Sequence, residues 1–230
     1  MLVNSLGSFK TFVESRLPEE FGKVKSTGSA VAIDHNLVLT ANHVIEGNRI
    51  QKVVIGKKIY RAKVLKRFII NDVAILQILT NKPLHSIKLG IPNPVFLGDF
   101  NFTVGYPAIE IFGTNPKFYR SYISGLEGPN GNSEMFQIFA DGGLGFSGGG
   151  VFQMDGCLIG LVSEMFVDDT GKMPDDFVYA TKIDPLLKDI QGFLSYKIEK
   201  SSDSEGKSNQ KIFQKVIESS VIVLNCKNEV

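Results

Sequence analysis

Large apolar residues near the start of the chain recur at the spacing of a helix. Five of them share this pattern: Leu6, Phe9, Phe12, Val13 and Leu17. Residues three and four apart lie on one face of an α-helix, so the pattern predicts a short amphipathic helix within residues 5–22, and Pro18 ends the helical pattern. We expect its apolar face to pack on the body of the protein. Docking to a partner protein is the alternative.

From Gly28 onward the apolar residues follow the shorter period of β-strands. Ser29 to Ile33 and Leu37 to Thr40 are short, apolar runs rich in β-branched residues, and the turn Asp34-His35-Asn36 between them predicts a hairpin. Further strand-sized runs occupy 52–55, 58–65, 73–78, 102–105, 118–123, 135–140, 150–152, 157–162 and 177–183. Glycine, proline and asparagine separate these runs. Many short strands with little helical periodicity predict an all-β barrel or sandwich.

The pattern changes again toward the C-terminus. Asp184 and Pro185 match a helix N-cap followed by proline at the first helical position, which predicts a helix over residues 184–190. Residues 201–210 are polar and have the composition of a flexible linker. The last twenty residues contain enough apolar side chains to pack against the rest of the protein, but their pattern does not show which surface they would contact.

Composition and charge narrow the class of protein. The chain has 230 residues, 43% of them hydrophobic, which is enough for one or two sizeable cores. Its 25 basic and 24 acidic side chains give a net charge of +1, so we expect no nucleic-acid partner and no membrane surface. No apolar run reaches membrane-spanning length. Two cysteines are too few for a disulfide-stapled scaffold, and Cys157 fits a small buried hydrophobe. The first residues lack a secretory-signal pattern, and we therefore expect a cytoplasmic protein.

A glycine-rich stretch around Ser147 carries the strongest chemical signal. Ser147 lies in the sequence GFSGGG, between Gly145 and Gly148, and a strand-like run follows at once. Glycines allow a loop to direct two backbone N–H groups at one point, which is the arrangement of an oxyanion hole. A serine nucleophile also needs a general base and an acid that orients this base.

His43 and Asp72 are the candidates for base and acid. Of the three histidines, His35 lies in a predicted turn and His85 in a predicted loop, whereas His43 directly follows a strand. Taken alone, His43 fits a structural histidine better than a base. Asp72 opens the run VAILQI, and taken alone it fits a strand cap or a turn residue.

Four stretches together resemble the chymotrypsin-like serine proteases, most closely the compact bacterial branch that includes the HtrA-type peptidases. Residues 28–45 contain GSAVAI and LVLTANHVI, similar to the family's strand pair that ends in Thr-Ala-x-His-Val. Residues 71–78, NDVAILQI, are similar to its acid motif. Residues 145–163 contain its Gly-x-Ser-Gly-Gly loop and the strands behind it. Residues 177–190 resemble its last strand and C-terminal helix, and the order His, Asp, Ser is also that of the family.

The resemblance implies an all-β fold of two antiparallel six-stranded β-barrels, with an N-terminal helix and a C-terminal helix. The implied boundaries are an N-terminal helix and lead-in over 1–27, a first barrel over 28–97, a second barrel with the C-terminal helix over 98–197, and a linker and tail over 198–230. The catalytic site would lie in the cleft between the barrels.

The resemblance also implies a serine endopeptidase that works through an acyl-enzyme. Ser147 would be the nucleophile, His43 the general base and Asp72 the residue that orients the base. The backbone N–H groups of Gly145 and Ser147 would form the oxyanion hole. We expect a protein or peptide substrate and an activating or complex-forming protein partner. We expect no cofactor and no metal, because the sequence has no clustered ligands at metal-binding spacing.

Three residues depart from the family's pattern and keep alternatives open. Asn42 stands where the family has alanine, Phe146 where activated trypsin-type enzymes have aspartate, and Gly150 where proline is usual. None of them removes a catalytic group, but all three could leave the loops poorly ordered. One alternative is therefore a catalytically idle relative that binds peptides or acts as a scaffold. Another is a protease that is active only with a partner.

The specificity pocket rests on weaker signals. Asp141 lies six residues before Ser147, a spacing similar to the pocket-floor acid of trypsin-like members, which favours cleavage after Lys or Arg. A turn-forming aspartate before two glycines is the alternative. Met165 would instead favour an apolar side chain. Ser163 and Glu164 are expected to run along the substrate backbone.

Overall fold

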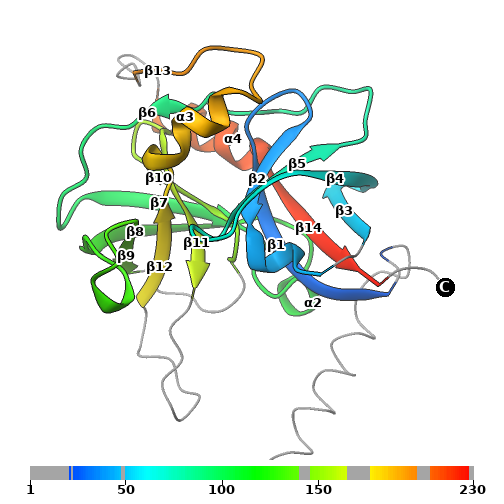
Figure 1. Ribbon diagram of the computed structural model, residues 1–230, viewed down its shortest axis with the longest axis horizontal. Coiled ribbons are helices and arrows are strands. Elements are labelled where there is room, and N and C mark those ends of the chain that lie inside the picture. Colours follow the sequence, from blue (N-terminus) through cyan, green and yellow to red (C-terminus); the bar gives the residue numbers. More distant parts are fainter. Residues whose placement is uncertain are drawn as a thin grey trace, which may run out of the picture.

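The strand-sized runs of the sequence pair into two closed, six-stranded antiparallel barrels, which lie side by side in the computed structural model (Figure 1). The structure describes residues 21, 23–47, 50–139, 146–164, 177–200 and 208–227. The predicted fold class, all-β with two six-stranded barrels, is therefore confirmed. Closure of each sheet leaves no free strand edge in the barrel wall.

The first barrel combines the N-terminal half of the chain with one strand from its C-terminal end. In the order of pairing its strands are β1 (Val24–Ala32), β14 (Ser220–Cys226), β3 (Ile50–Ile55), β4 (Lys58–Phe68), β5 (Val73–Ile78) and β2 (Leu37–Ala41). The predicted hairpin of β1 and β2 pairs Val31 with Leu39. On its other side β2 pairs with β5, Val38 opposite Leu76, and every residue of β2 is buried.

The second barrel is built from consecutive strands of the C-terminal half. Its order of pairing is β10 (Gly150–Gln153), β11 (Leu158–Glu164), β12 (Phe177–Lys182), β9 (Met135–Phe139), β8 (Lys117–Gly125) and β7 (Phe100–Gly105). The remaining elements are short: η2 (Asn42–Ile45), β6 (Gly90–Ile91), α2 (Ile109–Phe112), η3 (Pro129–Gly131), η4 (Asp184–Leu186), α3 (Leu187–Gln191), β13 (Glu199–Lys200) and α4 (Asn209–Ser219). None of the helices within the described ranges is long and apolar enough to span a membrane.

The helix predicted over residues 184–190 forms as η4 followed by α3. The helix predicted within residues 5–22 lies outside the residues that the structure describes, apart from Phe21. Cys157 and Cys226 are both buried thiols, as was predicted for Cys157.

The end of the chain differs from the linker and tail that the sequence suggested. Residues 220–226 form β14, which pairs with β1 on one side and β3 on the other. Every residue of β14 is buried, and Leu224 is fully enclosed. A strand with both faces buried has no alternation of polar and apolar residues. Its partners also lie far away in the sequence, so the local pattern reveals neither the strand nor its place.

Helix α4 leads into β14 and covers the seam between the barrels. Its buried residues Ile212 and Val216 join a core cluster that contains residues of both barrels, including Leu39 of β2 and Phe102 of β7. The ring of Phe213 meets Phe102 edge-on, with 4.8 Å between the ring centroids. The apolar residues of α4 therefore belong to the shared core.

Asp34 connects the β1–β2 turn to the segment after α3. Its carboxylate accepts hydrogen bonds from the Ser195 backbone N–H at 2.6 Å, from the Ser195 hydroxyl at 2.9 Å and from the His35 backbone N–H at 2.7 Å. Burial acts to raise the pKa of Asp34, but these bonds to the charged form outweigh it and lower the pKa to about 2. The C-terminal segment of the second barrel is thus bonded to the first.

We expect Leu224→Ala to lower the free energy of unfolding by about 2–5 kcal/mol, because the substitution leaves a cavity in a closed core. Chemical denaturation monitored by circular dichroism measures the change. Lys227→Ala, three residues further along and exposed, is the control and should change stability by less than about 0.5 kcal/mol. Equal stability of Leu224→Ala and the unmodified protein would mean that β14 is not part of the folded barrel.

We expect Asp34→Asn to destabilise the protein at neutral pH and to matter less in acid. A carboxyl whose folded pKa lies below its unfolded value stabilises the fold above the unfolded pKa, about 4, and loses this contribution as the pH falls toward 2. The pH-dependent part should be about 2 kcal/mol. Unfolding free energies measured between pH 7 and pH 2 test this. Asp189→Asn, an exposed carboxylate on α3, is the control, and a pH-independent effect of Asp34→Asn would contradict the expectation.

Candidate active site

Asp72 holds His43 by both its ring and its backbone. The His43 ring Nδ1 lies 2.7 Å from Asp72 Oδ2, and the His43 backbone N–H donates to Asp72 Oδ1 at 2.8 Å. The Asp72 carbonyl accepts a third bond, from the backbone N–H of Asn42 at 2.9 Å. Since η2 begins directly after β2, and Asp72 directly precedes β5, the pairing of these two neighbouring strands brings the residues together. Both side chains come from the first barrel.

Asp72 adopts an unusual backbone conformation. Its φ is +53°, in the left-handed region that few residues other than glycine enter. Such strained positions persist where surrounding bonds determine them, and they concentrate at functional sites. Here the carbonyl and both carboxylate oxygens are bonded to residues 42 and 43.

Ser163 of the second barrel bonds to the same carboxylate. Its hydroxyl donates to Asp72 Oδ2 at 2.5 Å. The register of β11 against β12 shifts between Val162 and Glu164, so Ser163 lies at a β-bulge. Bulges redirect single side chains near active sites, and this one accompanies a serine that faces the opposite barrel. The predicted role of Ser163, contact with the substrate backbone, is not tested by this bond.

The surroundings of Asp72 favour its ionised form. Burial of the carboxyl acts to raise the pKa, but the hydrogen bonds from His43 and Ser163 and the positive charge of a protonated His43 outweigh it and hold the pKa of Asp72 below its usual value. The His43 side chain is more open, with 39% of its surface exposed against 20% for Asp72. An ionised, sheltered acid and an accessible imidazole suit proton transfer at the surface of a cleft.

Ser147 lies in a tight turn that is held against the first barrel. The turn closes with a bond of 2.5 Å from Gly149 N–H to the Phe146 carbonyl, and the Ser147 carbonyl accepts from Ser29 N–H at 2.8 Å. Gly148 has a φ of +81°, and a Cβ there would lie 2.5 Å from Thr40 Oγ1 and 2.9 Å from the backbone N of Ala41. Only glycine fits this close approach, which brings the serine turn to the end of β2, where the His43 turn begins.

The two departures beside Ser147 have structural reasons. Phe146 is buried and meets the ring of Tyr119 edge-on at 4.9 Å, so its side chain fixes the turn by packing. A Cβ on Gly150 would lie 2.4 Å from the Phe152 ring and 2.8 Å from Val31 Cγ2, which leaves no room for the proline that the resemblance led us to expect there. Phe146 and Gly150 therefore both match the close packing around the Ser147 turn.

Arg67 supports the histidine turn, a role that no pattern in the sequence indicates. From β4, its guanidinium donates to Asn42 Oδ1 at 2.7 Å and to the carbonyl of Ile45 at 2.8 Å. Asn42 is buried away from water, so its side-chain amide oxygen needs a hydrogen-bond donor from the protein, and Arg67 provides this donor. Asn42, the third departure, is thus the acceptor for an arginine that bonds both ends of η2.

Several predicted site residues lie outside the described part of the chain. These are Asp141, Gly145 and Met165, and of Glu164 the structure describes only the backbone, in β11. His35 and His85 have exposed side chains, as expected for loop residues. Within the described ranges, no group of three or more His, Cys, Asp and Glu side chains could hold a metal ion.

We expect Arg67→Met to lower the free energy of unfolding by about 1.5–3 kcal/mol, because the substitution removes charge-assisted bonds and leaves the Asn42 amide oxygen buried without its donor. Thermal and chemical denaturation measure the loss. Arg61→Met is the matched control, since Arg61 is an exposed arginine on the same strand. Equal effects of the two substitutions would mean that the bonds to η2 contribute nothing specific.

Comparison with known proteins identifies relatives of this chain. A family model described as a trypsin-like peptidase domain matches residues 28–161, more than half of the sequence. The periplasmic serine endoprotease DegP of Salmonella typhimurium is 31% identical over 159 residues, which are 66% of this chain and 32% of that protein. The Escherichia coli K12 protein of the same name is 30% identical over 159 residues, with the same coverage. The chain thus matches about a third of the length of these relatives.

Solved structures show the same architecture. The HtrA-type protease AlgW, determined with a decapeptide, has 27% identity and a TM-score of 0.59, covering 72% of this chain and 50% of that one. The protease domain of MamO from Magnetospirillum magneticum has 16% identity and a TM-score of 0.57, covering 71% of this chain and 87% of that one. At this identity, MamO supports the fold alone.

The names of the relatives contradict the cytoplasmic location expected from the sequence. Both DegP proteins are named as periplasmic, and the Haemophilus influenzae relative is named "Probable periplasmic serine protease do/HhoA-like", which points to a periplasmic or extracytoplasmic location. The expectation was wrong because a low cysteine count and the absence of a signal-like pattern do not distinguish compartments. The matched family model and the barrel architecture lead to one assignment: this chain belongs to the trypsin-like peptidase family.

Proposed function

We propose that the protein is a serine endopeptidase in which Ser147, His43 and Asp72 form the catalytic triad. The observation that carries the proposal is the pair of bonds from His43 to the Asp72 carboxylate, together with the packing of the Ser147 turn against the end of β2. Family membership supports the reaction class, since the relatives are named as serine endoproteases.

In the proposed mechanism, Ser147 Oγ attacks the carbonyl carbon of the scissile bond. His43 Nδ1 is engaged by Asp72, so Nε2 is the nitrogen that takes the serine proton. Asp72 stays ionised because of its lowered pKa, and its negative charge stabilises the imidazolium that forms. His43 then gives the proton to the leaving amine. In the second half, His43 takes a proton from water as the water oxygen attacks the acyl carbonyl, and it returns this proton to Ser147 Oγ as the carboxylic acid leaves.

The negative charge on the tetrahedral oxygen needs donors that are already oriented. We assign this role to the backbone N–H groups of Gly145 and Ser147, on the resemblance of GFSGG to the family's loop. One such donor contributes roughly 3–4 kcal/mol to lowering the barrier. The packing of Phe146 and the close fit of Gly148 support a turn that is ordered before substrate arrives.

The proposed substrate is an extended segment of a protein or peptide. The relatives are endoproteases, and AlgW was solved with a decapeptide. In this proposal Ser163 and Glu164 contribute backbone contacts to the substrate, and Asp141 and Met165 line the pocket for the side chain before the cleaved bond. A preference for Lys or Arg follows if Asp141 is at the floor of this pocket, and an apolar preference follows if Met165 dominates. Activation by a partner protein is a further part of the proposal.

The alternative of an idle peptide-binding relative loses its sequence support. It rested on Asn42, Phe146 and Gly150, and each of these residues has a partner or a packing role in the folded chain. The structure therefore gives a reason for each of these three departures from the family's pattern. We therefore propose a single function.

A fluorophosphonate probe should react covalently with Ser147, because the probe needs a serine activated by a base. Mass spectrometry of the labelled peptide locates the reaction. Ser147→Ala should abolish labelling, and His43→Ala should slow it by about a thousandfold or more. Ser133→Ala, which changes an exposed serine after η3, is the control and should label normally.

The labelling should be repeated with cell lysate added, in case a partner completes the site. Folding of each variant is checked by its melting temperature. Failure of the folded, unmodified protein to label under either condition would overturn the proposed function.

A further inference from the structure

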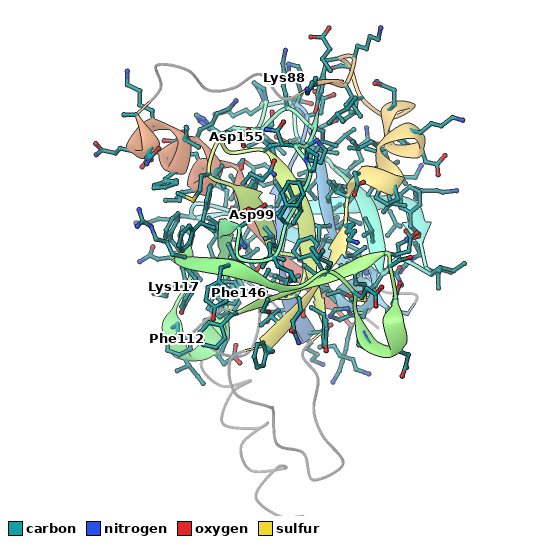
Figure 2. All side chains as sticks on the ribbon, turned by 90° about the vertical axis from the view of Figure 1, so that its left-hand side faces the viewer. Lys88, Asp99, Phe112, Lys117, Phe146 and Asp155 are labelled. Carbon is teal, nitrogen blue, oxygen red and sulfur yellow. The ribbon has the colours of Figure 1, made fainter. Side chains whose placement is uncertain are left out.

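A cavity of about 630 Å³ lies at the end of β10 opposite to Ser147. Four segments line it: residues 87–90 between the barrels, the β10–β11 turn at 155–157, residues 196–200 after α3, and α4. Figure 2 shows Lys88 and Asp155 in the upper part of the molecule and Phe146, the neighbour of Ser147, in the lower half. The cavity is therefore separate from the proposed active site.

The lining of this cavity is strongly basic. It contains five lysines and two carboxylates, which give a net charge of +3, whereas the whole chain has a net charge of +1. The lysines are Lys88, Lys197, Lys200, Lys211 and Lys215, and the carboxylates are Asp155 and Glu199. Positive and negative side chains are thus nearly equal in number over the whole chain, but positive ones are in excess in the lining of this cavity. Concave surfaces of one sign concentrate the electric potential and attract ligands of the opposite charge.

The lysines surround the cavity from different elements. Lys88 lies over the ring of Tyr196, with 5.5 Å from Nζ to the ring centroid, an arrangement that holds a cation in place. Lys211 and Lys215 are one helical turn apart, so they project from the same face of α4. Lys211 is also in the first turn of α4, where the positive end of the helix dipole adds to the potential.

The walls that carry these lysines are fixed by core packing. Ile87 and Leu89 are buried between the barrels, and Ile212 and Val216 attach α4 to the same core. Gly156 has a φ of +87°, and a Cβ there would lie 2.8 Å from Ile212 Cγ2. Helix and turn therefore meet at a distance that only glycine permits. The cavity is a built feature of the fold, with a volume in the range of small-molecule sites.

We propose that this cavity, which we call the lysine pocket, binds a compact ligand that carries two or more phosphate groups. Lysine is a common phosphate ligand that acts as a point charge, and linked phosphates place several negative charges within a small volume. An acidic peptide fits less well. Side chains on one face of an extended peptide repeat every two residues, roughly 7 Å apart, so three carboxylates would need a long groove.

The test uses the full chain and sodium tripolyphosphate as the probe, with binding measured by isothermal titration calorimetry and by the rise in melting temperature. We expect saturable binding that weakens with added salt. Lys197→Glu combined with Lys211→Glu should weaken it by about tenfold or more. The matched control is Lys57→Glu combined with Lys58→Glu, which makes the same charge change at the exposed β3–β4 turn, outside the pocket, and should bind as the unmodified protein does.

Two further arms separate the sources of phosphate. Vesicles of phosphatidylcholine with phosphatidylinositol 4,5-bisphosphate, compared with phosphatidylcholine alone, test a lipid headgroup that carries several phosphates. Dependence of either vesicle or tripolyphosphate binding on Lys197 and Lys211 supports the proposal and identifies the source. All measurements are repeated on Ser147→Ala, so they are independent of proteolysis. Absence of saturable binding to both probes, equal weakening by the control, or tighter binding of a polyglutamate peptide than of tripolyphosphate would overturn the proposal.

Discussion

The carboxylate of Asp72 is the interaction on which the candidate site depends. It accepts bonds from His43 in the first barrel and from Ser163 in the second, so one ionised group connects the two halves where they meet. A buried carboxylate without donors would be costly, and removing one partner of such a group destabilises more than the pair itself contributes. The left-handed backbone of Asp72 and the bulge at Ser163 are the two local distortions that bring these donors to one point.

Ser29 provides the corresponding connection on the side of the serine turn. Its backbone N–H bonds to the Ser147 carbonyl, its hydroxyl accepts from Tyr106 N–H at 2.8 Å, and its carbonyl accepts from the Thr40 hydroxyl at 2.7 Å. The backbone N–H and the hydroxyl of this buried residue thus hold the first barrel to the second, while its carbonyl bonds to β2 within the first barrel. Such fully satisfied polar networks tend to specify one arrangement of the packed parts. The relative position of the barrels, and with it the approach of the turn to β2, follows from this network.

Much of this architecture is readable in the sequence because it is local. The hairpin of β1 and β2 shows in its β-branched runs and its Asp-His-Asn turn, and the order of His43, Asp72 and Ser147 with their flanks indicates the family. The parts of the fold that the sequence pattern does not predict depend on contacts between residues far apart in the chain. Strand β14 pairs with strands that begin at Val24 and Ile50, and no local period reveals this.

The roles of single polar residues were hidden for the same reason. Arg67 looks like any exposed basic residue on a strand until the buried amide of Asn42 is found beside it. Asn42 in turn is, from the sequence, only a departure that could be tolerated or could perturb the histidine loop. Ser163 was predicted to contact substrate, and its bond to Asp72 requires knowledge of the bulge in β11. Periodic burial leaves a local pattern in the sequence, whereas hydrogen bonds across a barrel seam depend on the final geometry.

The lysine pocket and the candidate site share elements, although they lie at opposite ends of β10. Helix α4, which carries Lys211 and Lys215, continues directly into β14, and β14 pairs with β1 through Ile222 opposite Ser29. Ser29 is the residue that bonds to Ser147. A ligand that binds only the folded chain stabilises the whole fold by mass action. The segment that closes the first barrel thus also forms one wall of the pocket.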